Sequence, residues 1–325
     1  MGWYNILLMP TSLPEEVSEI KRKVKEFLEY MEVEKGASPL TLRNYRHYLS
    51  RFLAWMKKEK IRQRLKDINP DIVREYRLFL SRFPDGKGGT LSRRTQGYHV
   101  IAIRSFLKWC IKNDQEVMSP DKIDLPKINE RQVKFLNGEQ VDRLLNAPNM
   151  SKITGIRDKA ILEVLFSTGL RVSELCKLDR DKIDLKRREF GIVGKGGRAR
   201  VVFLSSRSTS WVEKYLAARD DGYNPLFIRH SGKIDAADTD EKMRLTPRSV
   251  QRMVKKYARK VQITVDVTPH VLRHSFATDL LVAGADIRSV QEMLGHKNIA
   301  TTQIYTHVTN KQLRDIHEAF HGKGN

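Results

Sequence analysis

Hydrophobic residues in the first third of the chain recur at helical spacing. From Pro14 to about Lys112, apolar positions three or four residues apart predict a bundle of about four helices. The segment PEEVSEIKRKVKEFLEYM forms the first helix, and Ser38 followed by Pro39 supplies an N-cap and a first turn for the second. The third helix is expected after Pro70, and the fourth within LSRRTQGYHVIAIRSFLKWCIK.

The helical spacing ends in the segment MSPDKIDLPKINERQVKFLNGEQ. Its short apolar-polar alternations and two prolines predict an extended linker. We therefore expect four parts along the chain, which are an N-terminal extension (1–13), a helical domain (14–118), an interdomain linker (119–135) and a second domain (136–325).

The second domain mixes helices with a short hairpin. The segment GIRDKAILEVLFSTGL predicts a helix, and EFGIV and ARVVFL predict two strands joined by the turn GKGGR. Thr268 and Pro269 begin a further helix that ends at Gly284, DIRSVQEML ends at Gly295, and another helix starts near Asn298. The expected fold class is α+β, mainly α with one small β-hairpin.

The net charge of the chain indicates a binding partner. The 325 residues include 60 Lys and Arg against 39 Asp and Glu, a net charge of +21. Between residues 35 and 112 there are 19 Lys and Arg against 5 Asp and Glu. This excess favours a polyanion partner, most simply nucleic acid, over a generically basic surface.

Four arginines flank the starts of two helices in the N-terminal domain. The positive ends of helices also favour phosphate, so we predict a DNA-facing role for the set, with a solvated surface as the alternative. The set consists of Arg43, Arg46, Arg93 and Arg94.

Several classes of protein are not expected from the composition. With only Cys110 and Cys176, neither a disulfide framework nor a thiolate zinc site is expected. The opening MGWYNILLM is short and lacks the basic leader of a signal peptide, and no apolar run approaches the length of a membrane span. These features predict a soluble protein of the reducing cytoplasm.

Four of the nine histidines lie between residues 270 and 308, together with two arginines and a tyrosine. A metal site, a site acting on phosphate and a solvated polar surface are the competing interpretations. His270 and His274 have the i, i+4 spacing of zinc ligands, but Val271 stands where a zinc protease carries its general base. Arg273 between them would repel a cation, so we expect no metal and no cofactor.

A site acting on phosphate fits the pattern better. His270 and Arg273 share a face of their helix, and His296 follows the turn at Gly295. Tyr305 supplies a potential nucleophile nine residues further along the chain. Upstream, Arg171 follows a Gly-containing turn, and Lys195 lies at the tip of the predicted hairpin. That hairpin is no P-loop, because no G-x-x-x-x-G-K-[ST] motif is present.

Four motifs, in this order, carry a resemblance to a known family. TGLRVSEL, GKGGRARVVFL, HVLRHSFATDLL and MLGHKNIATTQIYTHV resemble the tyrosine site-specific recombinases and integrases, and within them the Xer recombinases. The helical N-terminal domain is similar in order and size to the core-binding, SAM-like domain of that family. The motifs depart from the family pattern at Val271 and Asp279, and the segment IRHSGKIDAADTDEKMRL is longer than usual.

The resemblance implies an active site and a reaction. The implied catalytic set is Arg171, Lys195, His270, Arg273, His296 and Tyr305. Tyr305 would attack a DNA phosphodiester and form a 3′-phosphotyrosine, without metal or ATP. His274 and His307 fall outside this set and are interpreted as supporting or structural residues.

The resemblance also implies partners and a biological role. Double-stranded DNA at a specific site would be bound by a homo- or hetero-tetramer through exchange of C-terminal helices, acting in resolution of chromosome or plasmid dimers in the cytoplasm, at the nucleoid. Leu313, Ile316 and Phe320 line one side of the C-terminal segment, which alternatively packs on its own domain. The need for an activating protein is open.

Three other functions remain as alternatives. An integrase or transposase of a mobile element would share the chemistry, although only about 13 residues precede the first helix, too few for an added arm-binding domain. A type IB topoisomerase would use the same tyrosine chemistry without site specificity. A non-catalytic DNA-binding protein would need only the charge.

Overall fold

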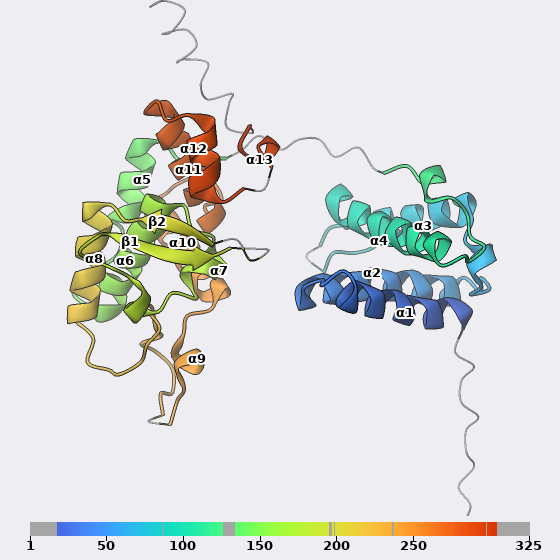
Figure 1. Ribbon diagram of the computed structural model, residues 1–325, viewed down its shortest axis with the longest axis horizontal. Coiled ribbons are helices and arrows are strands. Elements are labelled where there is room, and N and C mark those ends of the chain that lie inside the picture. Colours follow the sequence, from blue (N-terminus) through green and yellow to red (C-terminus); the bar gives the residue numbers. More distant parts are fainter. Residues whose placement is uncertain are drawn as a thin grey trace, which may run out of the picture. The chain divides into compact units, whose positions relative to one another are not determined.

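The computed structural model describes residues 18–303 except 87, 126–133, 195, 196, 198, 236 and 297. The chain divides into two compact units, residues 1–130 and 131–325, and each unit has its own hydrophobic core. Figure 1 shows the elements of each unit.

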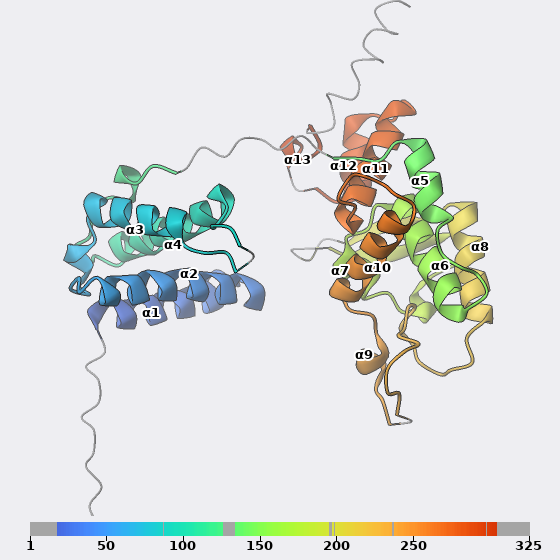
Figure 2. The same ribbon diagram turned by 180° about the vertical axis from the view of Figure 1, so that it is seen from behind.

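The first unit is a helical bundle. Figures 1 and 2 show α1 and α2 side by side as one layer, with α3 and α4 lying across it. This confirms the four expected helices. The α-helices and 3₁₀ helices of this unit are α1 (Glu19–Val33), α2 (Pro39–Lys58), η1 (Leu65–Asp67), α3 (Pro70–Arg82), α4 (Arg93–Lys112) and η2 (Pro120–Lys122).

Local signals in the sequence set where these helices begin. The side chains of Ser38, Asn69 and Ser92 each accept a hydrogen bond from a backbone N–H in the first turn of α2, α3 and α4. Proline follows directly at Pro39 and Pro70, where the missing N–H costs nothing.

The core of the first unit is rich in aromatic rings. They include Phe27, Phe52, Trp55, Tyr76 and Phe106, all with 4% or less of their surface exposed. One polar group lies among them: His99 on α4 is 1% exposed and its Nδ1 is 3.0 Å from the Tyr76 hydroxyl.

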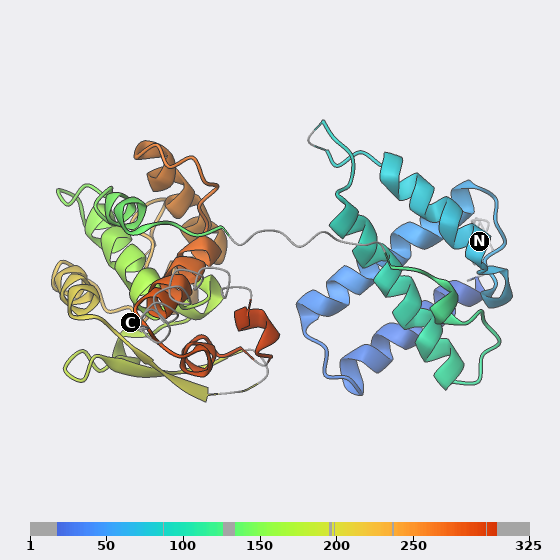
Figure 3. The same cartoon turned by 90° about the horizontal axis from the view of Figure 1, so that it is seen from above.

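The second unit surrounds α6 with helices and a two-stranded sheet. Helix α6 contacts α8 and α11, and Figure 3 shows α11 beside it from above. The elements of this unit are α5 (Gly138–Leu145), α6 (Ile153–Thr168), α7 (Val172–Leu175), η3 (Arg180–Lys182), β1 (Glu189–Val193), β2 (Ala199–Phe203), α8 (Ser206–Ala217), α9 (Asp240–Met243), α10 (Pro247–Lys260), α11 (Pro269–Val282), α12 (Ile287–Leu294) and α13 (Ala300–Gln303).

The expected hairpin is present as the antiparallel pair β1 and β2. Phe190 pairs with Val202 and Ile192 with Arg200, and the three apolar members of these pairs face the core. Because side chains alternate along a strand, one face of the hairpin is buried. The fold class expected from the sequence, mainly α with a small hairpin, is therefore confirmed.

Among the described residues, no helix combines the length and the apolar character that crossing a bilayer requires.

Candidate active site

Arg171 is placed by the turn that ends α6. Gly169 caps the helix with a φ of +60°, in the left-handed region that glycine adopts readily, and Arg171 then begins α7. The Arg171 amide and its Nη1 donate hydrogen bonds of 2.9 and 2.8 Å to the Glu174 carboxylate. Its Nη2 lies 3.5 Å from the carbonyl oxygen of Gly295, which is 124 residues away in sequence.

Arg273 approaches the same turn from α11 and is 2% exposed. Its Nη1 donates to the carbonyl of Gly169 (2.7 Å) and its Nη2 to the carbonyl of Leu294 (2.6 Å), at the ends of α6 and α12. Carbonyls at helix C-termini carry partial negative charge and favour a cation. The two arginines therefore meet at consecutive carbonyls, Leu294 and Gly295.

His270 and His274 lie one turn apart on α11, with ring centroids 4.4 Å apart in an edge-to-face arrangement. Partial burial, Arg273 and Arg171 lower the pKa of His270 below its usual value. Burial, His270 and Arg273 lower the pKa of His274 to about 4. Both imidazoles are therefore neutral at pH 7. His270 is only partly covered, so its exposed part can accept a proton.

His296 follows the Gly295 cap of α12. Its Nδ1 lies 2.9 Å from the hydroxyl oxygen of Thr302 on α13, and its carbonyl accepts a hydrogen bond from Gln291 Nε2 (3.1 Å). Burial, followed by Arg273, Arg171, His274 and Arg200, lowers the pKa of His296 to about 4. The His296 ring therefore lies within electrostatic reach of both arginines.

Two further residues of this site were not predicted from the sequence. Glu174 lies between Arg171 and Arg200, and Arg200 Nη2 and Nη1 donate to its two carboxylate oxygens at 2.9 and 3.3 Å. Arg200 also lies against the turn before His296, because a Cβ on Gly295 would be 2.9 Å from Arg200 Nη1. An acidic residue three positions after Arg171, at a helix start, was the available signal for Glu174.

The structure thus brings together Arg171, His270, Arg273 and His296 from α6–α7, α11 and the turn after α12. Lys195, Tyr305, His307 and the segment 310–325 lie outside the described residues. The described neighbours in sequence are Gly194 before Lys195 and Gln303 before Tyr305.

The side chains near His270 and His274 do not form the ligand set of a metal site. In the ranges that the structure describes, no three His, Cys, Asp or Glu side chains gather as ligands of one ion would. His270 and His274 have two guanidinium-bearing neighbours, Arg171 and Arg273, rather than a carboxylate. Such an arrangement attracts an anion.

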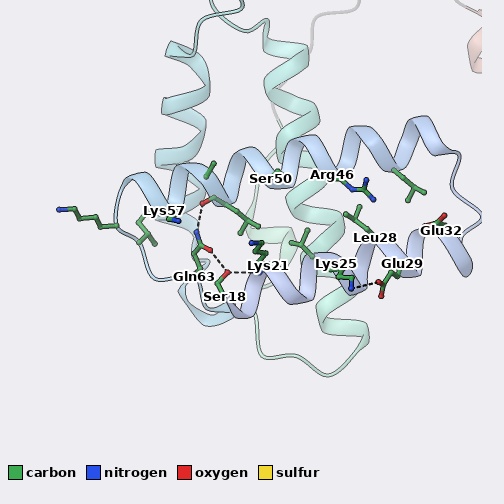
Figure 4. Close-up of a pocket in the computed structure, with 16 residues that line it drawn as sticks. Ser18, Lys21, Lys25, Leu28, Glu29, Glu32, Arg46, Ser50, Lys57 and Gln63 are labelled. Carbon is green, nitrogen blue, oxygen red and sulfur yellow. Dashed lines mark hydrogen bonds and ion pairs between the residues drawn. The ribbon is translucent and has the colours of Figure 1, made fainter. Parts of the chain in front are cut away.

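The four arginines of the N-terminal unit are all exposed, and Arg46 and Arg94 have different neighbours. Figure 4 shows Arg46 on a groove between α1 and α2, of about 800 Å³, which Lys21, Lys25 and Lys57 also line. Arg94 donates instead to the Tyr98 hydroxyl on α4 (3.1 Å).

Aromatic rings continue the surface beside Arg94. The Tyr98 ring stacks on Tyr48 of α2 at a centroid distance of 6.3 Å, and Tyr98 is 40% exposed. Cations interleaved with exposed aromatic rings are typical of nucleic-acid surfaces.

Helix α10 carries a second basic surface, which was not predicted from the sequence. Its apolar stripe is buried, and the opposite side is exposed. The exposed cations of α10 are Arg248, Arg252, Lys255, Lys256, Arg259 and Lys260.

This is a site for an anionic group such as a phosphate, because it combines two arginines, three neutral histidines and a basic surface. Residues 134–312 match the model of the phage integrase family, and residues 24–114 match the phage integrase N-terminal SAM-like domain. The chain belongs to this family, the tyrosine recombinases, which are enzymes that cut and rejoin DNA.

Individual relatives confirm the assignment to the family. The tyrosine recombinase XerD of Lacticaseibacillus casei is 34% identical over 302 residues, covering 93% of this chain and 99% of the relative. The tyrosine recombinase XerC of Myxococcus xanthus is 37% identical over 308 residues, covering 92% and 97%.

Solved structures support the fold. A crystal structure of the XerH site-specific recombinase, bound to a palindromic difH substrate after cleavage, matches with a TM-score of 0.67 and 23% identity. The match covers 95% of this chain and 91% of that one. The family models and the two relatives confirm the resemblance inferred from the four motifs. The structural match confirms the recombinase fold with its N-terminal SAM-like and C-terminal domains.

Proposed function

We propose that this protein is a site-specific recombinase that cuts and rejoins duplex DNA through a covalent 3′-phosphotyrosine at Tyr305. The observation that carries the proposal is the meeting of Arg171 and Arg273 at the carbonyls of Gly295 and Leu294, directly before His296. Membership of the tyrosine recombinase family supports the same reaction.

The two arginines suit a phosphoryl group that gains negative charge. In a pentacoordinate transition state, charge grows on the non-bridging oxygens, and guanidinium groups bind such oxygens with paired donors. The Arg171 side chain is 34% exposed and held by Glu174, so it can reach a substrate while keeping its orientation. Arg273 is buried, so little water screens its charge.

In the proposed step, Tyr305 Oη forms a bond to the scissile phosphorus and the bond from phosphorus to the 5′ oxygen breaks. The phenol proton passes to His270, which is neutral at pH 7, and Lys195 gives a proton to the departing 5′ oxygen. His296 donates a hydrogen bond to a non-bridging oxygen. Attack by a 5′-hydroxyl reverses these transfers and rejoins the strand.

The expected substrate is duplex DNA at a specific site, bound through basic surfaces of both domains. We include the α10 cations in this surface together with Arg43, Arg46, Arg93 and Arg94. The biological role proposed is Xer-like resolution of chromosome or plasmid dimers in the cytoplasm, at the nucleoid, because Xer recombinases are among the relatives.

A Tyr305→Phe variant tests the reaction. On a suicide substrate, in which a nick lets the attacked end diffuse away, the wild-type protein should accumulate a covalent protein–DNA adduct. The variant should bind the same DNA with an affinity within about twofold and form no adduct, since only the nucleophilic oxygen is lost. Adduct formed by the variant at the wild-type rate removes Tyr305 from this role.

The proposal also requires that the reaction proceed without metal or ATP, since the covalent bond conserves the phosphodiester. Cleavage in EDTA should match cleavage without it. A strict requirement for a divalent ion would contradict the roles given to Arg171 and Arg273.

We further propose a tetramer on two DNA sites, held by exchange of the C-terminal segment with its apolar residues Leu313, Ile316 and Phe320. Deletion of residues 310–325 should abolish synapsis and leave cleavage of a single site intact. Loss of folding in this truncated protein would show instead that the segment packs on its own domain.

A further inference from the structure

A buried hydroxyl contacts the proposed phosphate-binding histidine. Thr302 on α13 is fully buried, and its Oγ1 lies 2.9 Å from His296 Nδ1. Among the described residues, the Thr302 hydroxyl forms its side-chain hydrogen bond with His296. In sequence Thr302 is only three positions before Tyr305.

The state of the His296 ring determines what this contact can do. The charged and titratable groups that face the ring are Arg273 and His274 on α11, Arg171 at the start of α7 and Arg200 on β2. None of these is an anion that would stabilise an imidazolium, and burial disfavours the charged form as well. The ring is therefore neutral, with one proton shared between two nitrogens as alternative tautomers.

Only one of the two tautomers can donate a hydrogen bond to a phosphate from the nitrogen that faces it. Non-bridging phosphate oxygens only accept hydrogen bonds, so the nitrogen facing them must carry the proton. Because Nδ1 is turned to Thr302, the nitrogen left for a substrate is Nε2. A hydroxyl can donate to a bare Nδ1, and this arrangement leaves the proton on Nε2. With the reverse arrangement, a lone pair on Nε2 would face the anion.

We propose that Thr302 is a positioning residue whose hydroxyl donates to His296 Nδ1 and so holds the ring as the Nε2–H tautomer that a phosphate requires. The inference rests on the proposed function, in which His296 donates to the scissile phosphate. It adds to that function a specific residue outside the set of six.

The surrounding contacts separate this role from a purely structural one. The backbone of His296 is held independently, since its carbonyl accepts from Gln291 Nε2 (3.1 Å) and its amide donates to the Gln291 carbonyl (3.1 Å). The backbone of Thr302 is held by its own amide, which donates to the Ile299 carbonyl (2.7 Å). Replacing the hydroxyl by a methyl group therefore removes the contact with the His296 ring and leaves the backbone hydrogen bonds of both residues in place.

Three variants test the proposal in single-turnover cleavage at saturating protein. Thr302→Val keeps the side-chain shape without the hydroxyl, Thr302→Ser keeps the hydroxyl, and Thr301→Val removes an exposed hydroxyl from the neighbouring position as a control. Loss of one oxyanion donor costs roughly 10²- to 10³-fold in rate. We expect a loss of about 10- to 100-fold for Thr302→Val, because a misplaced tautomer weakens the donor without deleting it.

Comparing the cleavage rates of the three variants identifies the role of the Thr302 hydroxyl. Thr302→Ser should cleave within about threefold of the wild-type rate and Thr301→Val at the wild-type rate, and DNA affinity should be unchanged in all three. Wild-type cleavage by Thr302→Val, while Tyr305→Phe forms no adduct, would overturn the inference and leave the proposed function standing. Adduct formation by Tyr305→Phe would overturn the proposed function itself.

Nitrogen NMR reports the tautomer of the His296 ring in the wild-type protein directly, without a cleavage assay. In protein labelled with ¹⁵N-histidine, the ring nitrogen shifts of His296, assigned by their absence in His296→Gln, distinguish the tautomers. The inference predicts a protonated Nε2 and a bare Nδ1 at pH 7, with the population of this form reduced in Thr302→Val. A wild-type ring protonated on Nδ1 would overturn it.

Discussion

Glu174→Gln probes the contact that orients Arg171. The wild-type carboxylate accepts four hydrogen bonds of 2.8 to 3.3 Å, two from Arg171 and two from Arg200. Glutamine has the same shape but offers one acceptor oxygen, and its amide NH₂ points its protons at a guanidinium. The substitution also leaves two cations close together with no anion between them.

The size of the effect follows from burial. Breaking a buried ion pair from one side costs about 3–5 kcal/mol. The side chains of Glu174 and Arg200 are 9% and 11% exposed, but Arg171 is 34% exposed, so water replaces part of its loss. We therefore expect the free energy of unfolding to fall by about 2–3 kcal/mol, or roughly 5–10 °C in the melting temperature of a domain of this size.

The pH dependence identifies the charge as the cause. Burial alone would raise the pKa of Glu174, but hydrogen bonds from Arg200 and Arg171 outweigh it and hold that pKa below the usual value of a glutamate. A group whose folded pKa is depressed stabilises the fold above its unfolded pKa and loses this contribution as pH falls through the folded one. The difference in melting temperature between wild type and Glu174→Gln should thus be full above pH 5 and shrink below pH 4.5.

Glu139→Gln is the matched control. Glu139 pairs with Arg143 at 3.8 Å on the surface of the same unit and is 79% exposed, so its loss should cost less than about 1 kcal/mol. In parallel, Glu174→Gln should slow suicide-substrate cleavage by on the order of tenfold or more, because Arg171 loses its orientation, while DNA binding is retained. A Glu174→Gln protein that melts and cleaves like Glu139→Gln would show that Glu174 neither stabilises the fold nor orients Arg171.

Three further predictions concern other parts of the chain. Gly169→Ala should lower the free energy of unfolding by about 2–4 kcal/mol, because its φ is +60° and the new Cβ would lie 2.4 Å from Phe276 Cδ1. Thermal unfolding compares it with Gly191→Ala, whose new Cβ has open space. Burial lowers the pKa of His99 to about 4, so the unfolded chain takes up protons first as the pH falls. The stability monitored by tryptophan fluorescence should therefore fall by up to about 3 kcal/mol between pH 6.5 and 4, and by clearly less in His99→Gln. Arg252→Gln should reduce the slope of log affinity for DNA against log salt by about 0.9, and an unchanged slope would remove α10 from the interface.

Local sequence signals were sufficient for the helix ends and the hairpin. The cap at Thr268, the proline at Pro269 and the glycine at Gly295 act within one turn of chain, and each is found in its expected place. The hairpin likewise depends on alternation within strands of five residues, which a short segment already displays.

Tertiary contacts explain what the sequence did not predict. Arg200 and Glu174 are 26 residues apart, and their ion pair forms only because β2 is packed near the start of α7. Arg273 was expected to share a helix face with His270, but its burial was not predicted, nor were the carbonyls of Gly169 and Leu294 that its donors reach. Periodicity locates a helix face, but it carries no information on which distant carbonyls will meet that face.

Mapping the covalent bond between protein and DNA tests directly whether Tyr305 is the nucleophile. A suicide substrate trapped with the full-length protein is digested with protease and nuclease, and the modified peptide is sequenced by mass spectrometry. We expect a nucleotide joined through its 3′-phosphate to Tyr305, with a free 5′-hydroxyl on the released strand. Attachment at another residue, or through a 5′-phosphate, would contradict it.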